Sequence, residues 1–386
     1  MKLGLFTCWS VGTEGGRHYT LGCHQRYLEE YCKRLDRVVL VATMGPREEK
    51  HDCEINYPNL KIISIPYFNR YIEGMFKLPH ILAALLRLNT EVDAVYVRVP
   101  SPYCWLPRII CGRKKKILMH VCGDTLDASQ YGYHLPGIVR KLFRAAYMPE
   151  WLMTKWALKK TEFIVNGEKA YLKLKHLNEN CAMVISTTLR DEDFFMRETA
   201  RLEEKIVILY LGHIRAAKGI DVLIEAFKLI KDKYPRAQML IAGSGEYLDV
   251  LQRKVEQEGL DEKIVFTGHV CAGEQRNTLY RGADIFVFPS YSEGSPRVVI
   301  EAMANSLPVI TTTVGGLGNR LKDGEDALLV KPGSAVDIAS AIARMIDDIE
   351  LRRRCSINGY RKVLNHKVDA FIQSIVDRFQ QHGAFQ

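Results

Sequence analysis

Several features that would place the chain in other protein classes are missing from the sequence. Its 386 residues contain no run of about 18 uninterrupted apolar residues, so no transmembrane helix is expected. The ten cysteines include no Cys-x-x-Cys pair and no Cys/His cluster with the spacing of a zinc site. We therefore expect a reduced, cytoplasmic protein with free thiols, no disulfide framework and no zinc site of Cys/His type.

Repeats, low-complexity tracts and recognised nucleic-acid-binding motifs are also missing. The apolar run in MKLGLFTCWSVG is too short for a signal peptide and is typical of a first strand. The net charge is +9, and residues 101–160 alone hold 11 basic and 3 acidic side chains. This asymmetry predicts an anionic partner or surface for the first half, but without a motif it does not predict nucleic acid.

Two blocks of alternating strands and helices fill the chain, and its length also suggests two domains. The expected strands of the first block are KLGLFTC, RVVLVAT, LKIISIP, DAVYVRV, KKILMHV, TEFIVNG and CAMVIST. Those of the second block are KIVILYLG, AQMLIAGSG, KIVFTGHV, DIFVFPS, LPVITTT and DALLVKP. Helical patterns separate these strands, which predicts an α/β fold with parallel sheets covered on both faces.

We therefore expect two Rossmann-like, doubly wound domains facing a central cleft, where such folds bind ligands. The predicted N-terminal domain comprises residues 1–195, with the last helix, about 368–386, packing back on it. The predicted C-terminal domain comprises residues 196–367. The charged stretch TLRDEDFFMRETARLEEK, at about 188–205, is expected to be the linker.

The most informative stretch, residues 289–316, begins PSYSEGSPRVVIEAMA. Ser295 suits a helix N-cap and Pro296 the first helical position. The backbone N–H groups of Arg297 and Val298 would then point out of the helix start, which is a ready site for a phosphate.

Two carboxylates in this stretch lie eight residues apart. Glu301, one turn into the helix, could reach a ribose diol, and Glu293 in the preceding loop could reach a sugar. The alternative is an ordinary strand–loop–helix with solvated glutamates, because acidic residues are common near helix starts.

A second stretch, LYLGHIRAAKGIDVLIEAF, places basic side chains between a strand that ends at Gly212 and a helix. His213, Arg215 and Lys218 in this loop suit a diphosphate. The alternative is a solvated basic loop.

Together these motifs resemble the retaining glycosyltransferases of family 4, which have the GT-B fold of two Rossmann-like domains. The resemblance rests on Glu-x7-Glu within PSxxEG…EAMAxxxPVI, on LGHIRAAKGIDVLIEA as a phosphate-binding loop, and on IAGSGEYLDVL and VFTGHV. It is close over residues 205–345 and looser over 1–200, where GTEGGRHYT resembles the family's glycine-rich loop.

The resemblance assigns roles to individual residues. It implies that Lys218 holds the donor diphosphate and that Glu301 binds the nucleotide ribose. It implies that Val270 meets the base through its backbone. It implies that Glu293, with the backbone of Gly294 and Ser295, holds the donor sugar. It also implies that Gly15 and Gly16 allow the N-terminal loop to approach the phosphate and the acceptor.

The resemblance also implies a reaction. The donor would be a nucleoside-diphosphate sugar, the acceptor a glycan or lipid-linked precursor, and the anomeric configuration would be retained. A front-face route, in which the leaving phosphate takes the acceptor proton, needs no enzyme nucleophile. No cofactor and no essential divalent metal are expected.

The sequence departs from the family at three places. His213 stands where the family usually has Arg, so Arg215 is the candidate substitute. Cys122 stands where the family often has a His, before Gly123. His120 shares a strand face with Cys122 and could point into the cleft as a catalytic residue, or it could be a packed strand histidine. The family's Gly-Gly-x-Pro-Glu is replaced by Gly-Gly-Leu-Gly-Asn at 315–319.

Two charged segments lie outside these motifs. Residues 137–160 interleave basic and aromatic side chains, which suits peripheral contact with an anionic membrane; the alternative is a core-packed helix with a basic outer face. Residues 191–193, Asp-Glu-Asp, are similar to the Asp-x-Asp metal motif of a different glycosyltransferase fold, but we interpret them as a solvated charge run.

Two other functions compete with the transferase. A nucleotide-sugar epimerase of the same fold would need no acceptor. A non-catalytic nucleotide-sugar-binding subunit would not need Lys218, Glu293 and Glu301 together.

Overall fold

The computed structural model describes residues 1–68, 71–112, 114–123, 137–197, 202, 204–293, 296–314 and 320–381, with only the backbone of residues 137, 139, 140 and 143. The chain divides into two compact units. The N-terminal domain comprises 1–126, 136–188 and 368–386, and the C-terminal domain comprises 127–135 and 189–367. The division after Thr188 comes somewhat before the predicted boundary at 195.

The C-terminal domain is built on six parallel strands in the order β12-β11-β10-β13-β14-β15. The strands are β10 (Ile206–Leu211), β11 (Ala237–Ala242), β12 (Ile264–Gly268), β13 (Ile285–Phe288), β14 (Val309–Thr312) and β15 (Leu328–Val330). Every residue of β13 is buried, as expected for a central strand covered on both faces. All six had been predicted from their apolar runs.

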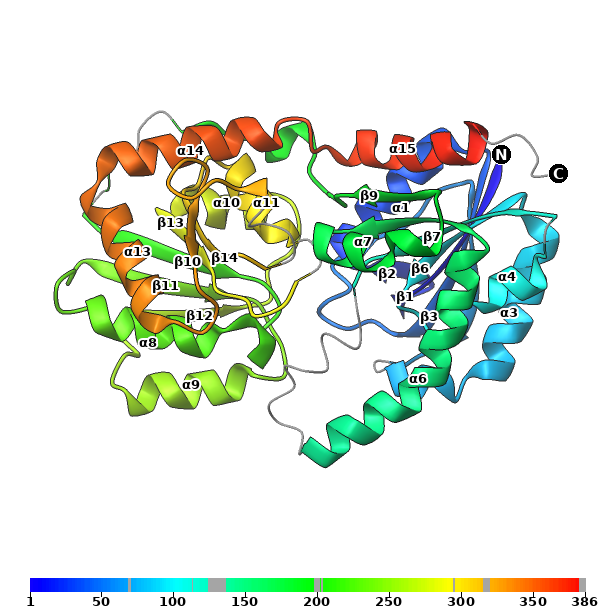
Figure 1. Cartoon of the computed structure of the whole chain (residues 1–386), viewed down its shortest axis with the longest axis horizontal. Helices are drawn as coiled ribbons and strands as arrows, with labels where there is room; N and C mark the ends of the chain where they lie inside the picture. Colours follow the sequence, from blue (N-terminus) through cyan, green and yellow to red (C-terminus); the bar gives the residue numbers. More distant parts are fainter. Residues whose placement is uncertain are drawn as a thin grey trace. The chain divides into compact units, whose positions relative to one another are not determined.

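Helices cover both faces of this sheet. They are α8 (Ile220–Ile230), α9 (Leu248–Gln257), α10 (Glu274–Gly282), α11 (Arg297–Ala304), α13 (Ala335–Asp347) and α14 (Ile349–Val363). Figure 1 shows α8 and α9 on one side of the strands and α10 and α11 on the other. Helix α8 packs against α13, and α11 packs against α14. The apolar stripe of α8, with Ile220, Leu223, Ile224 and Phe227 buried at helical spacing, shows why this segment is a surface helix.

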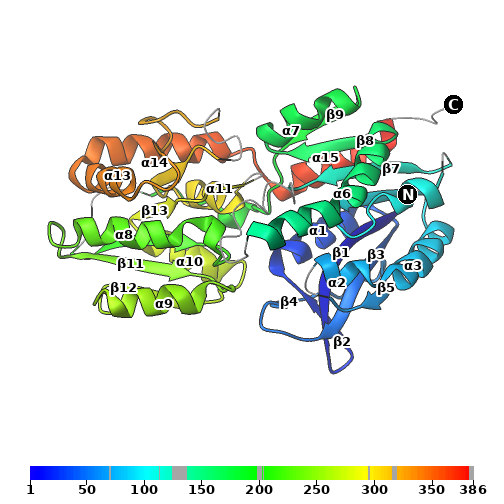
Figure 2. The same cartoon turned by 60° about the horizontal axis from the view of Figure 1, so that its bottom comes forward.

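The N-terminal domain has a nine-stranded, mostly parallel sheet. Its strands are β1 (Lys2–Glu14), β2 (Arg17–Thr20), β3 (Arg37–Pro46), β4 (Cys53–Glu54), β5 (Leu60–Pro66), β6 (Ala94–Val99), β7 (Lys116–Val121), β8 (Glu162–Asn166) and β9 (Cys181–Val184). Its helices are α1 (Gly22–Arg34), α2 (Tyr71–Met75), α3 (Leu78–Glu91), α4 (Leu106–Ile110), α6 (Gly137–Lys159), α7 (Glu168–Leu174) and α15 (Val368–Gln381). Helix α3 packs on β3 and β5, as Figure 2 shows.

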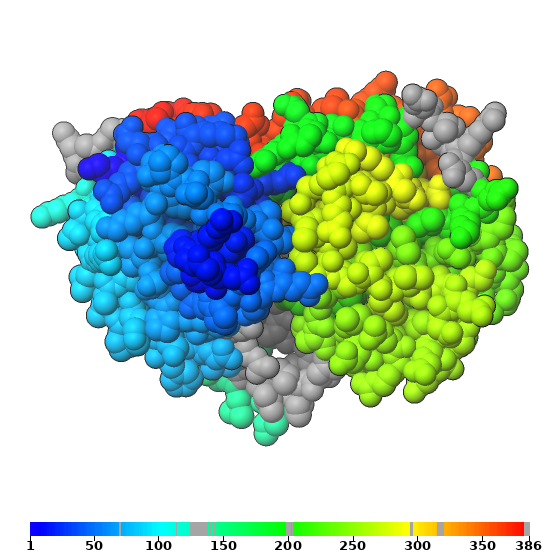
Figure 3. All heavy atoms as spheres, turned by 180° about the vertical axis from the view of Figure 1, so that it is seen from behind, coloured from blue at the N-terminus to red at the C-terminus, as the bar shows by residue number. Residues whose placement is uncertain are grey.

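The predicted glycine-rich loop is the turn of a β-hairpin. Strands β1 and β2 pair antiparallel with Glu14 opposite Arg17, which leaves Gly15 and Gly16 as a two-residue loop. Both glycines have positive φ, 55° and 78°, as the tight turns that suit hairpin twist require. The hairpin, in deep blue, stands out at the surface in Figure 3. The local geometry therefore accounts for both glycines without a ligand.

The last helix, α15, returns to the N-terminal domain and packs on α1, as predicted. Phe371, Ile372, Ile375 and Val376 are buried in the same core cluster as residues of β1 and β3. The helix therefore closes one face of the N-terminal sheet, although it is the last element in sequence.

Residues 191–193, which lie in the segment expected to be the linker, belong to the C-terminal domain. Asp193 lies in a short 3-10 helix, η3 (Asp191–Asp193), and is buried. Its carboxylate accepts hydrogen bonds from the side chain of Asn277 at 2.9 Å and from the backbone N–H of Arg190 at 2.8 Å. The interpretation of 191–193 as a solvated charge run is thus wrong for Asp193. Its side chain is buried, and its carboxylate accepts the backbone N–H of Arg190, the N-cap residue of η3.

Removing side-chain volume from the α15 contact should destabilise the N-terminal domain selectively. Ile375 is fully buried, so Ile375→Ala is expected to lower the free energy of unfolding by about 3 kcal/mol. All four tryptophans lie in the N-terminal domain, so tryptophan fluorescence during urea unfolding follows that domain alone.

The matched control is Gln380→Ala, an exposed position of the same helix. An unchanged urea midpoint for Ile375→Ala would show that α15 does not contribute to this core.

Candidate functional site

The order of strands in the C-terminal sheet reverses between β10 and β13. The chain runs outward through β10, β11 and β12, returns to the centre, and continues outward through β13, β14 and β15 on the other side. The loops that follow β10 and β13 therefore leave the same edge in different directions, and such a switch point is where open α/β sheets bind ligands. Lys218 follows β10 and Glu293 follows β13.

Lys218 and Glu293 form an ion pair at this switch point, with side chains only 18% and 13% exposed. The carboxylate of Glu293 also accepts a hydrogen bond from the hydroxyl of Ser290 at 3.0 Å. The ammonium of Lys218 lies 5.4 Å from the centre of the Phe288 ring. The structure thus brings together two of the residues predicted from separate motifs.

Backbone contacts hold the two loops against each other. Gly219 has a φ of 66°, and a Cβ there would lie 2.4 Å from the carbonyl oxygen of Pro289, so a larger residue would force the loops apart. The carbonyl of Ala217 accepts a hydrogen bond from the backbone N–H of Tyr291 at 2.9 Å. The position of Lys218 is therefore fixed relative to the loop that carries Glu293.

His213 and Arg215 lie in the same β10–α8 loop, opposite a carboxylate from the loop after β11. Glu246 approaches Nδ1 of His213 at 3.8 Å and Nε of Arg215 at 4.0 Å. Burial, followed by the charge of Arg215, lowers the pKa of His213 from 6.5 to about 4. At neutral pH the loop therefore presents Arg215 and Lys218 as its cations, with His213 neutral.

Gly212, the residue before His213, directly follows Leu211, the last residue of β10. Its backbone N–H donates to the carbonyl of Ala242 at 3.0 Å, and the N–H of Ile214 donates to Ser244 at 2.9 Å. These bonds join the loops that follow β10 and β11, so the basic loop is part of a rigid edge.

Glu301 lies on α11 and is held by two side chains of α10. Its carboxylate accepts a hydrogen bond from the hydroxyl of Tyr280 at 3.1 Å and lies 3.5 Å from Nη1 of Arg276. Burial, followed by the Glu301 charge, raises the pKa of Tyr280 well above its usual value, so the phenol keeps its proton. Arg276 also donates to the carbonyl of Val270 at 3.3 Å. The predicted ribose and base residues are thus joined through Arg276.

The start of α11 differs by one residue from the prediction. The helix begins at Arg297, with Pro296 at the N-cap in an extended conformation and no side chain capping it. The prediction of Ser295 as N-cap and Pro296 as first helical residue is therefore wrong, because the extended backbone of Pro296 precedes the first helical turn. Gly294 and Ser295 lie outside the described residues, as do residues 315–319. Arg297 and Val298, with Val299, supply the first N–H groups of the helix.

His120 is a packed strand histidine. It lies on β7, is 1% exposed, and its Nδ1 is hydrogen-bonded to the hydroxyl of Tyr96. The ring of Phe371 from α15 lies 6.0 Å from it. The expectation that His120 points into a cleft as a catalytic residue is corrected, because α15 covers that position.

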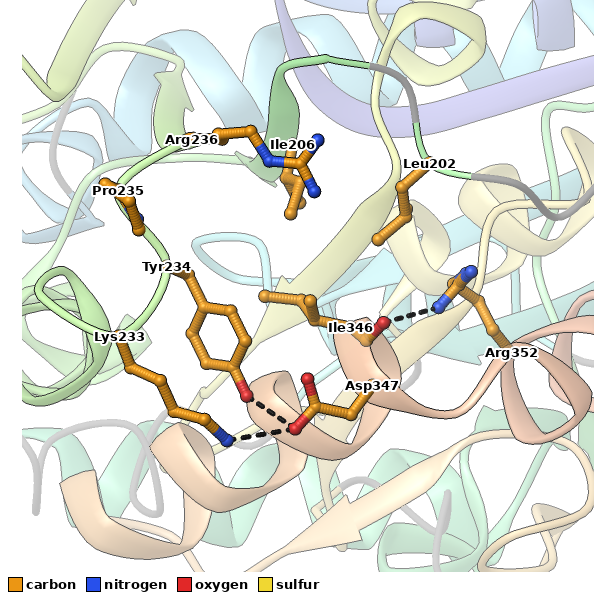
Figure 4. Close-up of a pocket in the computed structure, with 9 residues that line it drawn as sticks. All are labelled: Leu202, Ile206, Lys233, Tyr234, Pro235, Arg236, Ile346, Asp347 and Arg352. Carbon is orange, nitrogen blue, oxygen red and sulfur yellow. Dashed lines mark hydrogen bonds and ion pairs between the residues drawn. The ribbon is translucent and has the colours of Figure 1, made fainter.

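A different hollow, of about 420 Å³, lies at the opposite edge of the C-terminal sheet (Figure 4). Ile206 at the start of β10 lines it, together with Leu202, Lys233, Tyr234, Pro235, Arg236, Ile346, Asp347 and Arg352. Tyr234 and Lys233 donate to Asp347 at 2.7 and 3.0 Å, and Arg352 donates to the carbonyl oxygens of Met345 and Ile346 at the end of α13. These groups cap a helix C-terminus, so we place the functional site at the carboxyl edge instead.

Four residues at the carboxyl edge were missed in the sequence: Glu246, Arg276, Tyr280 and Ser290. Two of them carried a local signal, since Ser290 lies in the PSxxEG motif and Glu246 in IAGSGEYLDVL. Arg276 and Tyr280 reach the site from α10, whose approach depends on the tertiary fold.

Comparison with known proteins places these features in context. Residues 191–362 match the family model described as glycosyl transferases group 1. An uncharacterized glycosyltransferase of Methanocaldococcus jannaschii is 34% identical over 44% of this chain and 43% of its own length. A capsular polysaccharide biosynthesis glycosyltransferase, CapM, of Staphylococcus aureus is 33% identical over 44% of this chain and 47% of its own length. The matched region is thus less than half of either relative.

A solved structure resembles the whole chain. The HepE protein of Anabaena, in a crystal structure with UDP and glucose, has a TM-score of 0.72 at 16% identity, covering 99% of this chain and 100% of that one. This likeness confirms the predicted fold class of two Rossmann-like domains. The description of the matched family model does not specify family 4, so membership of family 4 stays a prediction.

The pKa of His213 offers a test of the geometry of the basic loop. Because Arg215 contributes to the lowered pKa, Arg215→Gln is expected to raise the pKa of His213 toward 6.5. NMR titration of the His213 imidazole would measure both values. The unfolded chain binds this proton near pH 6.5 and the folded protein only near pH 4, so His213 should cost stability increasingly as the pH falls between them.

His213→Asn is the control, since it lacks that contribution to the pH dependence of stability. A wild-type imidazole that titrates near 6.5, or is unaffected by Arg215→Gln, would contradict the described arrangement.

Proposed function

Because residues 191–362 match the family model of glycosyl transferases group 1, we propose that this protein transfers a sugar from a nucleoside-diphosphate sugar to an acceptor. The observation that carries the proposal is the meeting of Lys218 and Glu293 at the switch point of the C-terminal sheet. These residues come from the two motifs that resemble the donor site of family 4. The UDP present in the HepE structure supports a nucleoside diphosphate as the donor's leaving group.

Stabilising the leaving diphosphate is the main chemical task. When the bond between the sugar and the diphosphate breaks, negative charge develops on the phosphate oxygens, and fixed positive groups stabilise that charge. Lys218, Arg215 and the uncapped start of α11 supply such groups. We propose that they do so without a metal ion, and that no cofactor takes part.

The remaining contacts orient the donor. In this proposal Glu301 accepts hydrogen bonds from the ribose hydroxyls, and Tyr280 holds it in place. Val270 meets the base through its backbone, and Glu293 meets the sugar together with Gly294 and Ser295. Holding both ends of the donor fixes the anomeric carbon relative to the acceptor.

We propose that the reaction retains the anomeric configuration. The support is the resemblance of the Glu-x7-Glu motif to retaining enzymes. Glu293, the carboxylate nearest the sugar in this scheme, is paired with Lys218 and accepts a hydrogen bond from Ser290. Such pairing weakens a nucleophile and favours the front-face route, in which the leaving phosphate takes the proton of the acceptor hydroxyl.

For the acceptor we propose a glycan or lipid-linked precursor at the inner face of a membrane. CapM acts in capsular polysaccharide biosynthesis, according to its name. Among the described residues no helix is both long enough and apolar enough to cross a membrane. None of the ten cysteines, all of which lie in described residues, forms a disulfide, as expected in a reducing compartment.

Helix α6 supports contact with an anionic membrane surface. Its C-terminal half packs in the core, where Trp151 is buried, so the core-packed alternative holds there. In its N-terminal half Ile138 is 70% exposed and Leu142 65% exposed, on one face at a spacing of four. Lys141, beside them, is also exposed. Exposed apolar side chains next to basic ones suit the interface of an anionic membrane.

Nucleotide binding is the first test. Thermal-shift measurements would use UDP, GDP, ADP and dTDP, each together with its glucose or mannose conjugate. At least one nucleoside diphosphate and its sugar conjugate should raise the melting temperature of the protein. Removing the ribose contact by Glu301→Ala should weaken binding of that nucleotide by about tenfold or more, as for a lost charged hydrogen bond.

Glu256→Ala, at an exposed site on α9, is the matched control. Stabilisation by none of these ligands, or equal affinity in Glu301→Ala, would contradict the proposal. Formation of an epimerised nucleotide sugar without any acceptor would favour the epimerase, and binding without turnover of any acceptor would favour a non-catalytic subunit.

Membrane contact can be tested with vesicles of phosphatidylglycerol and phosphatidylcholine. The double variant Ile138→Ser/Leu142→Ser should lower co-sedimentation affinity by about tenfold, since it removes two apolar side chains from the interface. Leu229→Ser, an equally exposed apolar site on α8, is the control. Wild-type protein that does not sediment with anionic vesicles would disprove the contact.

A further inference from the structure

The ion pair between Lys218 and Glu293 occupies both residues that the proposed function assigns to the donor. Lys218 would hold the diphosphate and Glu293 the sugar, yet in the structure each is the ion-pair partner of the other. Both side chains are mostly removed from solvent, so neither charge can be separated from its partner without a replacement. A donor that takes Lys218 must therefore release Glu293.

Ser290 is the third member of this cluster; it lies two residues after β13 and is fully buried. Its hydroxyl lies 3.0 Å from Oε1 of Glu293, 3.2 Å from the carbonyl of Ala217 and 3.3 Å from the carbonyl of Ser292. A hydroxyl has one proton, so it donates to one of these acceptors at a time. The carbonyl of Ser290 accepts from the hydroxyl of Thr312 at 2.6 Å, which fixes the backbone beneath it.

Resting on the proposed function, we propose that Ser290 is a positioning residue that keeps Glu293 directed toward the donor sugar once the diphosphate has displaced Glu293 from Lys218. In the donor-free protein Glu293 competes with the diphosphate for the Lys218 ammonium. In the donor complex the diphosphate takes Lys218, and the carboxylate accepts from Ser290 and from sugar hydroxyls. Recognition of the diphosphate and recognition of the sugar are thereby coupled through one exchange of partners.

This exchange predicts opposite effects of one substitution on two kinds of ligand. Glu293→Gln removes the negative charge that competes for Lys218 and keeps the shape of the side chain. It should therefore strengthen binding of a bare diphosphate and weaken the additional binding that the sugar provides. If Glu293 had only a structural role, its substitution would change the affinity for the diphosphate and for the nucleotide sugar in the same direction.

The first experiment uses inorganic pyrophosphate, which needs no knowledge of the base, and isothermal titration calorimetry. Glu293→Gln is expected to bind pyrophosphate about fivefold more tightly than wild type, because Lys218 no longer makes a charged hydrogen bond that the pyrophosphate must replace. Lys218→Met should bind it more weakly than wild type. Glu256→Gln, the same charge change at an exposed site on α9, should leave the affinity unchanged, and circular dichroism melting verifies that each variant is folded.

The outcomes separate the two proposals. If Lys218→Met binds pyrophosphate as tightly as wild type, the placement of the diphosphate fails and this inference fails with it. If Lys218→Met loses binding while Glu293→Gln is no tighter than wild type, the proposed function stands and the exchange of partners is overturned.

The second experiment tests Ser290 with nucleotide sugars, measured against their nucleoside diphosphates: UDP-glucose with UDP, and GDP-mannose with GDP. Ser290→Ala should leave affinity for pyrophosphate within about twofold of wild type while lowering affinity for the bound nucleotide sugar about fivefold, the size of one hydrogen bond to a charged group. Ser292→Ala, the neighbouring hydroxyl, is the control. Equal losses for pyrophosphate and nucleotide sugar, or no loss for either, would overturn the role of Ser290.

Discussion

A cation and a carboxylate meet at the place where the strand order of the C-terminal sheet reverses, and the proposed chemistry depends on that contact. The two charges come from loops that leave neighbouring strands, β10 and β13, and only the reversal between these strands brings the loops together. Taking both charges out of water is costly, and a pair of apolar residues would often stabilise a fold as well or better. We therefore interpret the pair as a binding site in which a second anion can take the place of the carboxylate beside Lys218.

The rest of the carboxyl edge follows from the same constraint. Because Gly219 lets the β10–α8 loop rest on Pro289, Lys218 has little freedom to move away from Glu293. Helix α11 begins in the loop that carries Glu293, so Glu301 is placed by the same segment and held from α10 by Tyr280. The residues proposed to contact phosphate, sugar and ribose are thus linked through a short stretch of chain, which suits a ligand that spans all three.

The N-terminal domain has a different organisation. It is completed by α15, which follows the whole C-terminal domain in sequence but packs beside α1. Helix α15 covers His120 and packs through apolar side chains such as Phe371, so residues from both ends of the chain form the core of this domain. The exposed apolar and basic residues of α6 lie outside this core, where a surface partner can reach them.

Much of the fold could be read from the sequence, because apolar runs of strand length and helical stripes such as that of α8 are local properties. The sequence also determined the two donor motifs, since residue type and spacing alone carry the resemblance. Helix α14 was missed because its polar sequence, IELRRRCSINGYRKV, gives a weak apolar pattern. Only the tertiary structure decided that Asp193 is a buried cap, that His120 is covered, that Tyr280 and Arg276 hold Glu301, and that Glu293 pairs with Lys218. Each of these depends on which distant segments approach one another, and that is set by strand order and packing, which no local pattern of residues encodes.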